Sequence, residues 1–173
     1  MTNYKQLLSE VKTFIFDVDG VMTNGIVFLG PGGELLRNMN VKDGYAIHLA
    51  AKKGYRIIII SGGSSESVRQ RFELLGVSEI HLGVSHKLEV FEKLVQKYDL
   101  NPEQILYMGD DIPDYEVMAA VGVPVCPTDA VEEIRDVSKY ISPYKGGEGC
   151  VRDVIEQVLR IQDQWFDDDG FRW

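Results

Sequence analysis

The chain has 173 residues, of which 45% are hydrophobic and 26% charged, and this length and composition suit a single globular domain. Its 27 acidic and 18 basic residues leave a formal charge of −9, which argues against nonspecific binding to nucleic acid or to an anionic membrane. No apolar run approaches the roughly 18 residues of a membrane span, and no secretory-type stretch precedes the first acidic pair. We therefore expect a cytoplasmic protein.

Short apolar runs alternate with helical patterns along the chain. The runs at 13–16, 55–60, 105–108, 123–125 and 140–141 have the composition of strands. The isoleucines at 57–60 would be apolar on both faces, which is typical of a parallel strand covered by helices on both sides. Residues 87–98 and 151–165 carry apolar side chains at helical spacing. The pattern predicts an α/β protein with a doubly wound, Rossmann-like, three-layer parallel sheet.

Residues 26–41 interrupt this alternation. Two apolar arms flank the sequence Gly30-Pro31-Gly32-Gly33, which predicts a β-hairpin directly after the first strand. We interpret it as an active-site flap or an oligomer contact, with a hairpin packed on its own domain as the alternative. Asp43 is our candidate cap for the helix that follows. The composition of residues 166–173 predicts a flexible acidic tail. We expect residues 1–173 to form one domain.

Acidic residues follow two of the predicted strands at the points where those strands end. Asp17 and Asp19 come directly after residues 13–16, and Asp110, Asp111 and Asp114 follow residues 105–108. The carboxyl ends of parallel strands line the ligand crevice of such a sheet, so these groups should meet there. Neighbouring carboxylates favour a cation, and oxygen ligands favour Mg²⁺. An isolated Asp-x-Asp-Gly also occurs as a capped turn, but a second acidic group favours a metal site.

Two further features suit a phosphate group. Ser61 and Gly62 follow the isoleucine run and offer a hydroxyl and backbone N–H groups at a strand-to-helix turn. Lys87 opens a predicted helix, where the helix dipole disfavours a cation, and this indicates another purpose for it. The alternatives are an ordinary turn and a solvated lysine.

Taken in this order, these motifs resemble the haloacid dehalogenase superfamily of aspartate-nucleophile phosphatases. The resemblance implies that Asp17 is the nucleophile, that Asp19 is the general acid and base, and that Ser61, Gly62 and Lys87 bind phosphate. It also implies an Mg²⁺ ion held by Asp17, Asp110 and the backbone carbonyl of Asp19. Asp111 and Asp114 would support this site.

Residues 40–44, 83–87, 109–114 and 146–152 look like the small capless branch of that superfamily, which hydrolyses sugar-acid phosphates. The type member cleaves 3-deoxy-D-manno-octulosonate 8-phosphate (KDO 8-phosphate) in lipopolysaccharide sugar biosynthesis. The similarity implies no cap domain, and a homotetramer whose hairpins pack together and whose residues 146–149 lie near a neighbour's active site. The expected substrate ligands beyond the phosphate site are Lys42, Asp43, Gly44 and Arg71. The cations considered for the sugar carboxylate are Lys42, Arg69, Arg71, Lys145 and Arg152, with Arg71 the first choice.

Two positions depart from this pattern and leave alternatives open. Gly63 and Glu148 stand where octulosonate phosphatases often carry arginine, so 9-phosphates of the nine-carbon acids KDN or N-acetylneuraminate are alternative substrates. A receiver domain or a non-catalytic scaffold are the alternatives of another class. A receiver places its acceptor aspartate well after the acidic pair, and the intact catalytic set argues against a scaffold.

Overall fold

The computed structural model describes residues 4–171, and a six-stranded sheet of order β5-β4-β1-β6-β7-β8 organises them. Every neighbouring pair in this sheet is parallel. The strands are β1 (Thr13–Phe16), β4 (Arg56–Ile60), β5 (Glu79–His81), β6 (Ile105–Met108), β7 (Val123–Cys126) and β8 (Tyr140–Ile141). The predicted doubly wound sheet is thus confirmed. The chain reverses its direction of strand addition at β1 and β6, which is where such sheets bind ligands.

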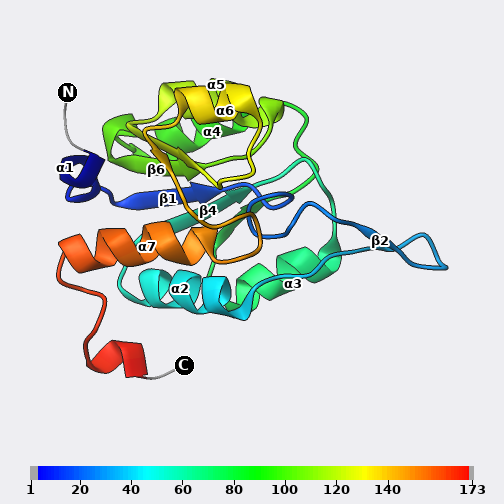
Figure 1. The fold of residues 1–173 in the computed structure, drawn as a ribbon, viewed down its shortest axis with the longest axis horizontal. Coiled ribbons are helices and arrows are strands. Elements are labelled where there is room, and N and C mark those ends of the chain that lie inside the picture. The colour runs from blue at the N-terminus through cyan, green and yellow to red at the C-terminus, as the bar shows by residue number, and fades with distance from the viewer. Residues whose placement is uncertain (1–3, 172–173) are drawn as a thin grey trace.

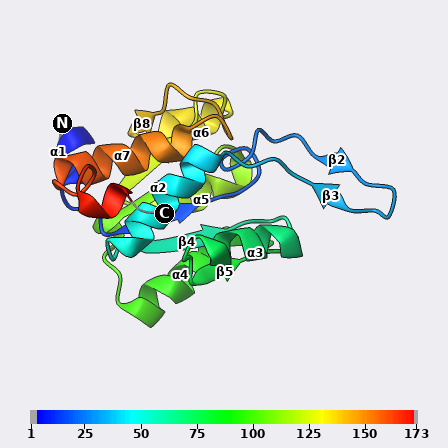
Figure 2. The same ribbon diagram turned by 90° about the horizontal axis from the view of Figure 1, so that it is seen from below.

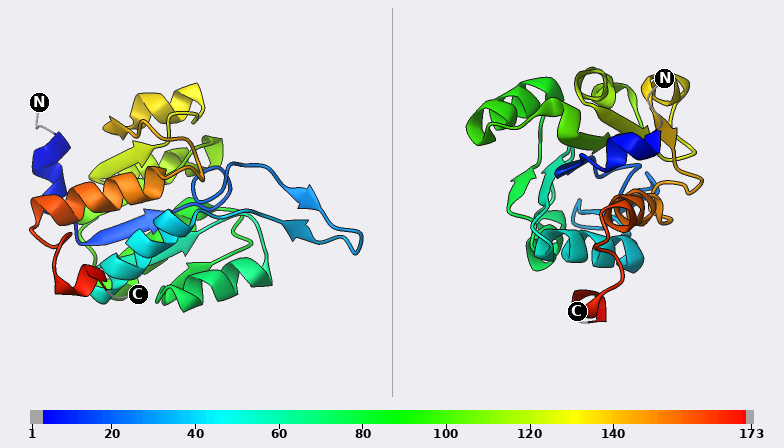
Figure 3. Two further views of the ribbon diagram at one scale, coloured as in Figure 1. Left: turned by 60° about the horizontal axis from the view of Figure 1, so that its bottom comes forward. Right: turned by 90° about the vertical axis from the view of Figure 1, so that its left-hand side faces the viewer.

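Helices cover both faces of the sheet (Figures 1 and 3). On one face lie α2 (Val41–Lys52), α3 (Glu66–Leu74) and α7 (Cys150–Ile161), and on the other lie α4 (Lys87–Tyr98), α5 (Tyr115–Ala120) and α6 (Glu132–Val137). A short α1 (Tyr4–Leu8) precedes β1. Because strand side chains alternate, Phe14 and Phe16 join the core beneath α2 and α7, whereas Ile15 joins the core beneath α4 and α5.

The predicted hairpin is present and projects away from the sheet (Figure 2). Its paired strands, β2 (Phe28–Leu29) and β3 (Leu35–Leu36), are shorter than the predicted range of 26–41. All four paired residues are exposed, Leu29 to 81%, so the alternative of a hairpin packed on its own domain is wrong for this chain. Between β1 and β4 the described chain forms only this hairpin and α2, in agreement with the expected absence of a cap domain.

Several element ends differ from the prediction. Asn40 and not Asp43 caps α2, because the Asn40 side chain accepts a hydrogen bond of 2.8 Å from the Lys42 N–H. The helix predicted over 151–165 ends at Ile161. The strand β5 escaped prediction because Glu79 and His81 interrupt its apolar pattern.

The C-terminal segment up to Phe171 packs against α2, although the sequence predicted a flexible tail over 166–173. Lys53 Nζ lies 2.5 Å from an Asp167 oxygen and 2.9 Å from an Asp169 oxygen. The Tyr45 hydroxyl donates a hydrogen bond of 2.5 Å to the Gly170 carbonyl. The acidic residues of the tail therefore form ion pairs with Lys53, which follows the last residue of α2. Residues 172–173 of the predicted tail lie outside the described residues.

Candidate active site

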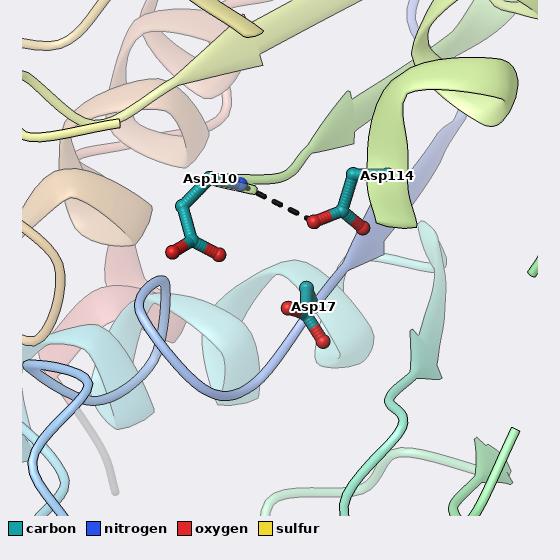
Figure 4. A group of neighbouring side chains, drawn as sticks. All are labelled: Asp17, Asp110 and Asp114. Atoms are coloured by element: carbon teal, nitrogen blue, oxygen red, sulfur yellow. Dashed lines mark hydrogen bonds between the residues drawn. The ribbon is translucent and has the colours of Figure 1, made fainter. Parts of the chain in front are cut away.

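Three carboxylates meet at the carboxyl ends of β1 and β6, as the sequence predicted (Figure 4). Asp17 follows β1, whereas Asp110 and Asp114 follow β6, and the register of the two strands pairs Phe16 with Met108. One oxygen from each carboxylate lies within 4.8 Å of the others. Groups that are distant in sequence therefore form one acidic cluster.

Two glycines make this crowding possible. Gly20 has a φ of +87°, and a Cβ there would lie 1.9 Å from Asp110 Oδ2. A Cβ at Gly109 would lie 2.4 Å from the Asp114 side chain. Both positions thus need glycine for the carboxylates to approach the backbone closely.

Lys87 is buried beside this cluster, so the alternative of a solvated lysine is wrong for this residue. Its Nζ lies 3.0 Å from Asp17 Oδ1 and 2.7 Å from Asp114 Oδ1. Asp114 Oδ1 also accepts a hydrogen bond of 2.6 Å from the buried Tyr107 hydroxyl, and Asp114 Oδ2 accepts one of 3.3 Å from the Asp110 N–H. Asp114 therefore fixes the position of the Lys87 ammonium. Tyr107 was missed from the sequence, where its only signal is a hydroxyl within a buried apolar strand.

The electrostatics of the cluster fit a divalent cation. Burial, with the Asp114 charge adding and Lys87 opposing, raises the pKa of Asp17 to about 7. Burial and the charges of Asp17 and Asp114 raise the pKa of Asp110 to about 8. Asp110 Oδ1 is buried and accepts no hydrogen bond within the described chain. A hard cation would supply the missing positive charge, and Mg²⁺ fits these oxygen donors.

These pKa values predict that Mg²⁺ binding is coupled to pH. Asp17 and Asp110 must lose their protons to act as ligands, and their pKa values lie above the ordinary range. Mg²⁺ should therefore bind more tightly, by about tenfold or more, as the pH rises from about 6 to about 8. Isothermal titration calorimetry in buffers of different ionisation enthalpy measures the affinity and the protons released. A pH-independent affinity without proton release would contradict the prediction.

Asp19 is directed differently from the other carboxylates. It lies outside the three-carboxylate cluster and is paired with Arg37, which follows β3 of the hairpin. Arg37 Nε lies 2.6 Å from Asp19 Oδ1, and Arg37 Nη2 lies 2.9 Å from Asp19 Oδ2. Arg37 was not among the candidates taken from the sequence.

A cavity of about 400 Å³ joins the predicted phosphate ligands to the carboxylates. The predicted site residues that line it are Asp17, Asp19, Ser61, Gly62, Lys87, Asp110, Asp111 and Asp114. The buried Ser61 hydroxyl accepts a hydrogen bond of 3.3 Å from the Gly63 N–H, and the Asp111 carboxylate accepts one of 2.8 Å from the Ile112 N–H. Asp111 thereby starts the short 3-10 helix (Ile112–Asp114) that carries Asp114.

The structure does not bring Lys42, Asp43, Gly44 and Arg71 into this cavity. Lys42 lines a separate cavity of about 610 Å³. The buried Asp43 accepts a hydrogen bond of 2.7 Å from the Arg152 N–H and so caps α7, whose own N-cap residue, Gly149, has no side chain to do so. Burial raises the pKa of Asp43 to about 6. Gly44 lies beneath Arg71, since a Cβ at residue 44 would lie 2.6 Å from Arg71 Nη2.

The other candidate cations also lie outside the cavity around Asp17. Arg69 donates a hydrogen bond of 3.2 Å to the Ile80 carbonyl, and the Arg152 guanidinium lies 5.1 Å from the centre of the Trp165 ring. Lys145 is exposed. Within a single chain, these cations are therefore not placed to contact a substrate in that cavity.

Residues 146–149 pack against the active-site turn of their own chain. A Cβ at Gly146 would lie 1.9 Å from the Gly20 carbonyl oxygen, and the Gly147 N–H donates a hydrogen bond of 2.9 Å to the Val21 carbonyl. The Asn40 side chain donates one of 3.2 Å to the Gly147 carbonyl. This loop thus braces the turn that follows Asp19.

Gly146→Ala should displace that turn. We expect a loss of about 1–3 kcal/mol in the free energy of unfolding, since the added methyl group has no room, together with a lower kcat. Urea denaturation and steady-state kinetics measure the two effects. Gly54→Ala is the control, because Gly54 has a φ of +88° and open space around it. That variant should lose stability through backbone strain but keep its kcat, and an unchanged kcat in Gly146→Ala would contradict the bracing role.

The fold and the acidic site define a class of hydrolase, and comparison with known proteins identifies the family. The sequence model of the haloacid dehalogenase-like hydrolases matches residues 26–122. The chain belongs to this family.

Within it, the chain is similar to the 3-deoxy-D-manno-octulosonate 8-phosphate phosphatase KdsC of Yersinia pestis, at 36% identity over 159 residues, or 92% of this chain and 85% of the relative. The crystal structure of the Yersinia pestis phosphatase superposes with a TM-score of 0.91 at 35% identity, covering 94% of this chain and 88% of that one. A Moraxella catarrhalis phosphatase of the same name, solved with magnesium, phosphate and KDO, has a TM-score of 0.90 at 32% identity, covering 94% of both chains.

Over residues 4–171, no helix combines the length and the apolar character that crossing a membrane would require.

Proposed function

We propose that this protein is an Mg²⁺-dependent phosphomonoesterase that hydrolyses KDO 8-phosphate to KDO and phosphate through an aspartyl-phosphate on Asp17. The observation that carries the proposal is the buried group of Asp17, Lys87 and Asp114. Beside this group lies Asp110, whose buried Oδ1 accepts no hydrogen bond within the described residues. The substrate choice is supported by the similarity to KdsC of Yersinia pestis and by the Moraxella catarrhalis relative, which was solved with KDO.

In the first step, Asp17 attacks the phosphorus atom and the bond from phosphorus to the sugar oxygen breaks. Asp19 gives its proton to the departing sugar oxygen. Ser61 and the Gly62 backbone bind the phosphate oxygens, and Lys87 offsets their charge. Asp17, Asp110 and the Asp19 carbonyl are the groups that would hold Mg²⁺, which when bound supplies the positive charge that lets an anionic nucleophile meet a phosphate dianion.

In the second step, water attacks the phosphorus atom of the aspartyl-phosphate and restores the Asp17 carboxylate. Asp19 accepts the proton of that water. The salt-bridged form of Asp19 in this structure is the form that accepts a proton. The first step uses the protonated form, in which one of the two bonds from Arg37 has to open.

We also propose that the active site is completed in a homotetramer in the cytoplasm. The cavity around Asp17 is open, and the candidate carboxylate-binding cations of the same chain lie outside it. Exposed leucines and a phenylalanine on β2 and β3 provide an apolar surface for a neighbouring subunit. The free, buried cysteines Cys126 and Cys150 suit a reducing compartment.

Replacing Leu29 and Leu36 with serine should weaken this assembly. Both side chains are exposed, to 81% and 53%, so the folded chain loses little when they change, whereas a subunit interface would lose its apolar contact. Multi-angle light scattering should show a tetramer for the wild type and smaller species for the double variant. The pair Leu74→Ser and Phe166→Ser is the control, because these exposed residues lie outside the hairpin. A monomeric wild type would contradict the proposed assembly.

Phosphate release from KDO 8-phosphate and from an aryl phosphate tests the function. We expect multiple turnovers with both compounds, abolished by a chelator and restored by Mg²⁺. A receiver domain would at most take up phosphate once, and a scaffold would release none. The absence of Mg²⁺-dependent turnover with both compounds would overturn the proposal.

A further inference from the structure

Arg37, which follows β3 of the hairpin, uses all three of its guanidinium nitrogens in contacts beside the active site. Arg37 Nε donates a hydrogen bond of 2.6 Å to Asp19 Oδ1, and Arg37 Nη2 donates one of 2.9 Å to Asp19 Oδ2. Its third nitrogen, Nη1, donates a hydrogen bond of 2.9 Å to the Leu35 carbonyl of β3. The Arg37 side chain is only 7% exposed, whereas that of Asp19 is 34% exposed. Such a two-point contact fixes the orientation of a carboxylate, which a single ammonium does not.

The loop after β4 is shaped around this pair. A Cβ at Gly63 would lie 2.9 Å from Asp19 Oδ2 and 3.0 Å from Arg37 Nη2. Asp19 lines the cavity of Asp17, whereas its partner Arg37 does not. Residue 63 is therefore small where the Arg37 guanidinium needs space. Among the residues that line the cavity of Asp17, Asp19 is the one that Arg37 pairs with.

The charges at the site are divided between two cations. Lys87 is paired with Asp17 and Asp114, whereas Arg37 is paired with Asp19. The oxygens that gather within 4.8 Å of one another belong to Asp17, Asp110 and Asp114, and Asp19 is outside that group. The Asp19 carboxylate is thus paired with Arg37 and is not part of the acidic cluster.

We propose that Arg37 is a positioning residue that holds the Asp19 carboxylate away from the metal ligands and in the orientation in which it accepts the proton of the attacking water, so that the segment after β3 sets the geometry of catalysis. This inference rests on the proposed function for the role of Asp19. Without Arg37, the Asp19 carboxylate is free to turn toward the metal site, where it adds negative charge and no longer faces the reacting oxygen.

The proposal predicts opposite effects on catalysis and on metal binding. With an aryl phosphate as substrate and saturating Mg²⁺, Arg37→Gln should lower kcat about 10- to 100-fold and change KM less than about threefold. In calorimetric titrations with Mg²⁺ alone, the same variant should bind the ion about three- to tenfold more tightly, because a nearby positive charge is gone and a carboxylate is released. Arg37→Lys should recover only part of kcat, since it keeps the charge but not the two-point contact.

A double-mutant cycle shows whether Arg37 acts through Asp19. In an Asp19→Asn background, Arg37→Gln should change kcat by less than about threefold, because the carboxylate it positions is absent. Gly63→Ala should reproduce part of the loss in kcat by crowding the pair. Arg56→Gln is the control: this arginine stacks on Tyr98, with its guanidinium 4.0 Å from the ring centre, at the opposite end of β4. It should leave kcat and Mg²⁺ affinity unchanged.

An unchanged kcat, an effect confined to KM, additive effects in the cycle or a weaker Mg²⁺ affinity in Arg37→Gln would each overturn the proposal. The calorimetric arm needs no turnover. If the wild type hydrolyses neither phosphate ester, the proposed function fails, whereas the Mg²⁺ affinities of the wild type and Arg37→Gln still decide whether Arg37 restrains Asp19.

Discussion

Asp17→Asn should lower kcat by a factor of about 10⁴ or more while leaving the protein folded. An amide nitrogen or oxygen at this position does not form the acyl phosphate, so the covalent route is closed. The buried Asp17 carboxyl has a pKa raised to about 7, chiefly by burial, which means that its charge is unfavourable in the metal-free protein. Lys87 also keeps its partner Asp114 in this variant, so no buried charge is left unpaired. A neutral amide of the same shape should therefore change the free energy of unfolding by no more than about 1 kcal/mol.

Steady-state kinetics, denaturant unfolding and mass spectrometry of acid-quenched protein test this expectation. The wild type should show a phosphorylated peptide containing Asp17 during turnover, and the variant should show none. Asp136→Asn, on the exposed surface of α6, makes the same change of charge away from the site and should behave as wild type. Near-full turnover of Asp17→Asn in the presence of Mg²⁺ would contradict the covalent mechanism.

Lys87→Met should have the next largest effect, on both activity and stability. The substitution leaves Asp17 and Asp114 buried without their ammonium partner. Breaking a buried pair in this way costs about 3–5 kcal/mol, and the loss of the phosphate-facing charge should lower kcat by a factor of about 10³.

The stability loss should depend on pH in a defined direction. Lys87 opposes the rise in the Asp17 pKa, so that pKa should rise further in the variant. A carboxyl whose pKa is higher in the folded than in the unfolded protein supports folding when protonated, and this support is lost as the pH rises toward the folded-state pKa. Lys87→Met should thus be more destabilised, relative to the wild type, at about pH 8 than at about pH 6.

Urea denaturation at both pH values measures this difference. As a control, adding Asp114→Asn to Lys87→Met removes one of the two buried carboxylates that lost their ammonium partner. The double variant should recover part of the stability but none of the activity. An equal loss at both pH values, or an intact kcat, would show that the buried ion pairs do not have the assigned role.

The parts of the site that lie at strand ends were predictable from the sequence. Asp17 and Asp110 each follow a continuous apolar run, and parallel strands bring such positions to one edge. Lys87 was recognisable because it begins a helix, where a cation is unfavourable. In each case a local pattern and a general rule of sheet geometry were sufficient.

The parts that depend on loop paths were not predictable. Arg37 reaches Asp19 only because the chain returns from the hairpin beside the loop at Gly63. Asp43 lies in a motif that the resemblance assigned to substrate binding, but the packing of α2 against α7 makes it the cap of α7. The docked tail depends on the meeting of Asp167 with Lys53. Such contacts between distant segments leave no periodic signal in the sequence.

The substrate is the central claim, and a comparison of kcat/KM values tests it most directly. Phosphate release should be measured with Mg²⁺ for KDO 8-phosphate, KDN 9-phosphate, N-acetylneuraminate 9-phosphate and a hexose phosphate. We predict the highest kcat/KM for KDO 8-phosphate, by about tenfold or more over the nine-carbon esters, a difference of about 1.4 kcal/mol in transition-state binding. A higher value for either nine-carbon ester would contradict the eight-carbon assignment, and a preference for the hexose phosphate over all three would contradict a sugar-acid phosphatase altogether.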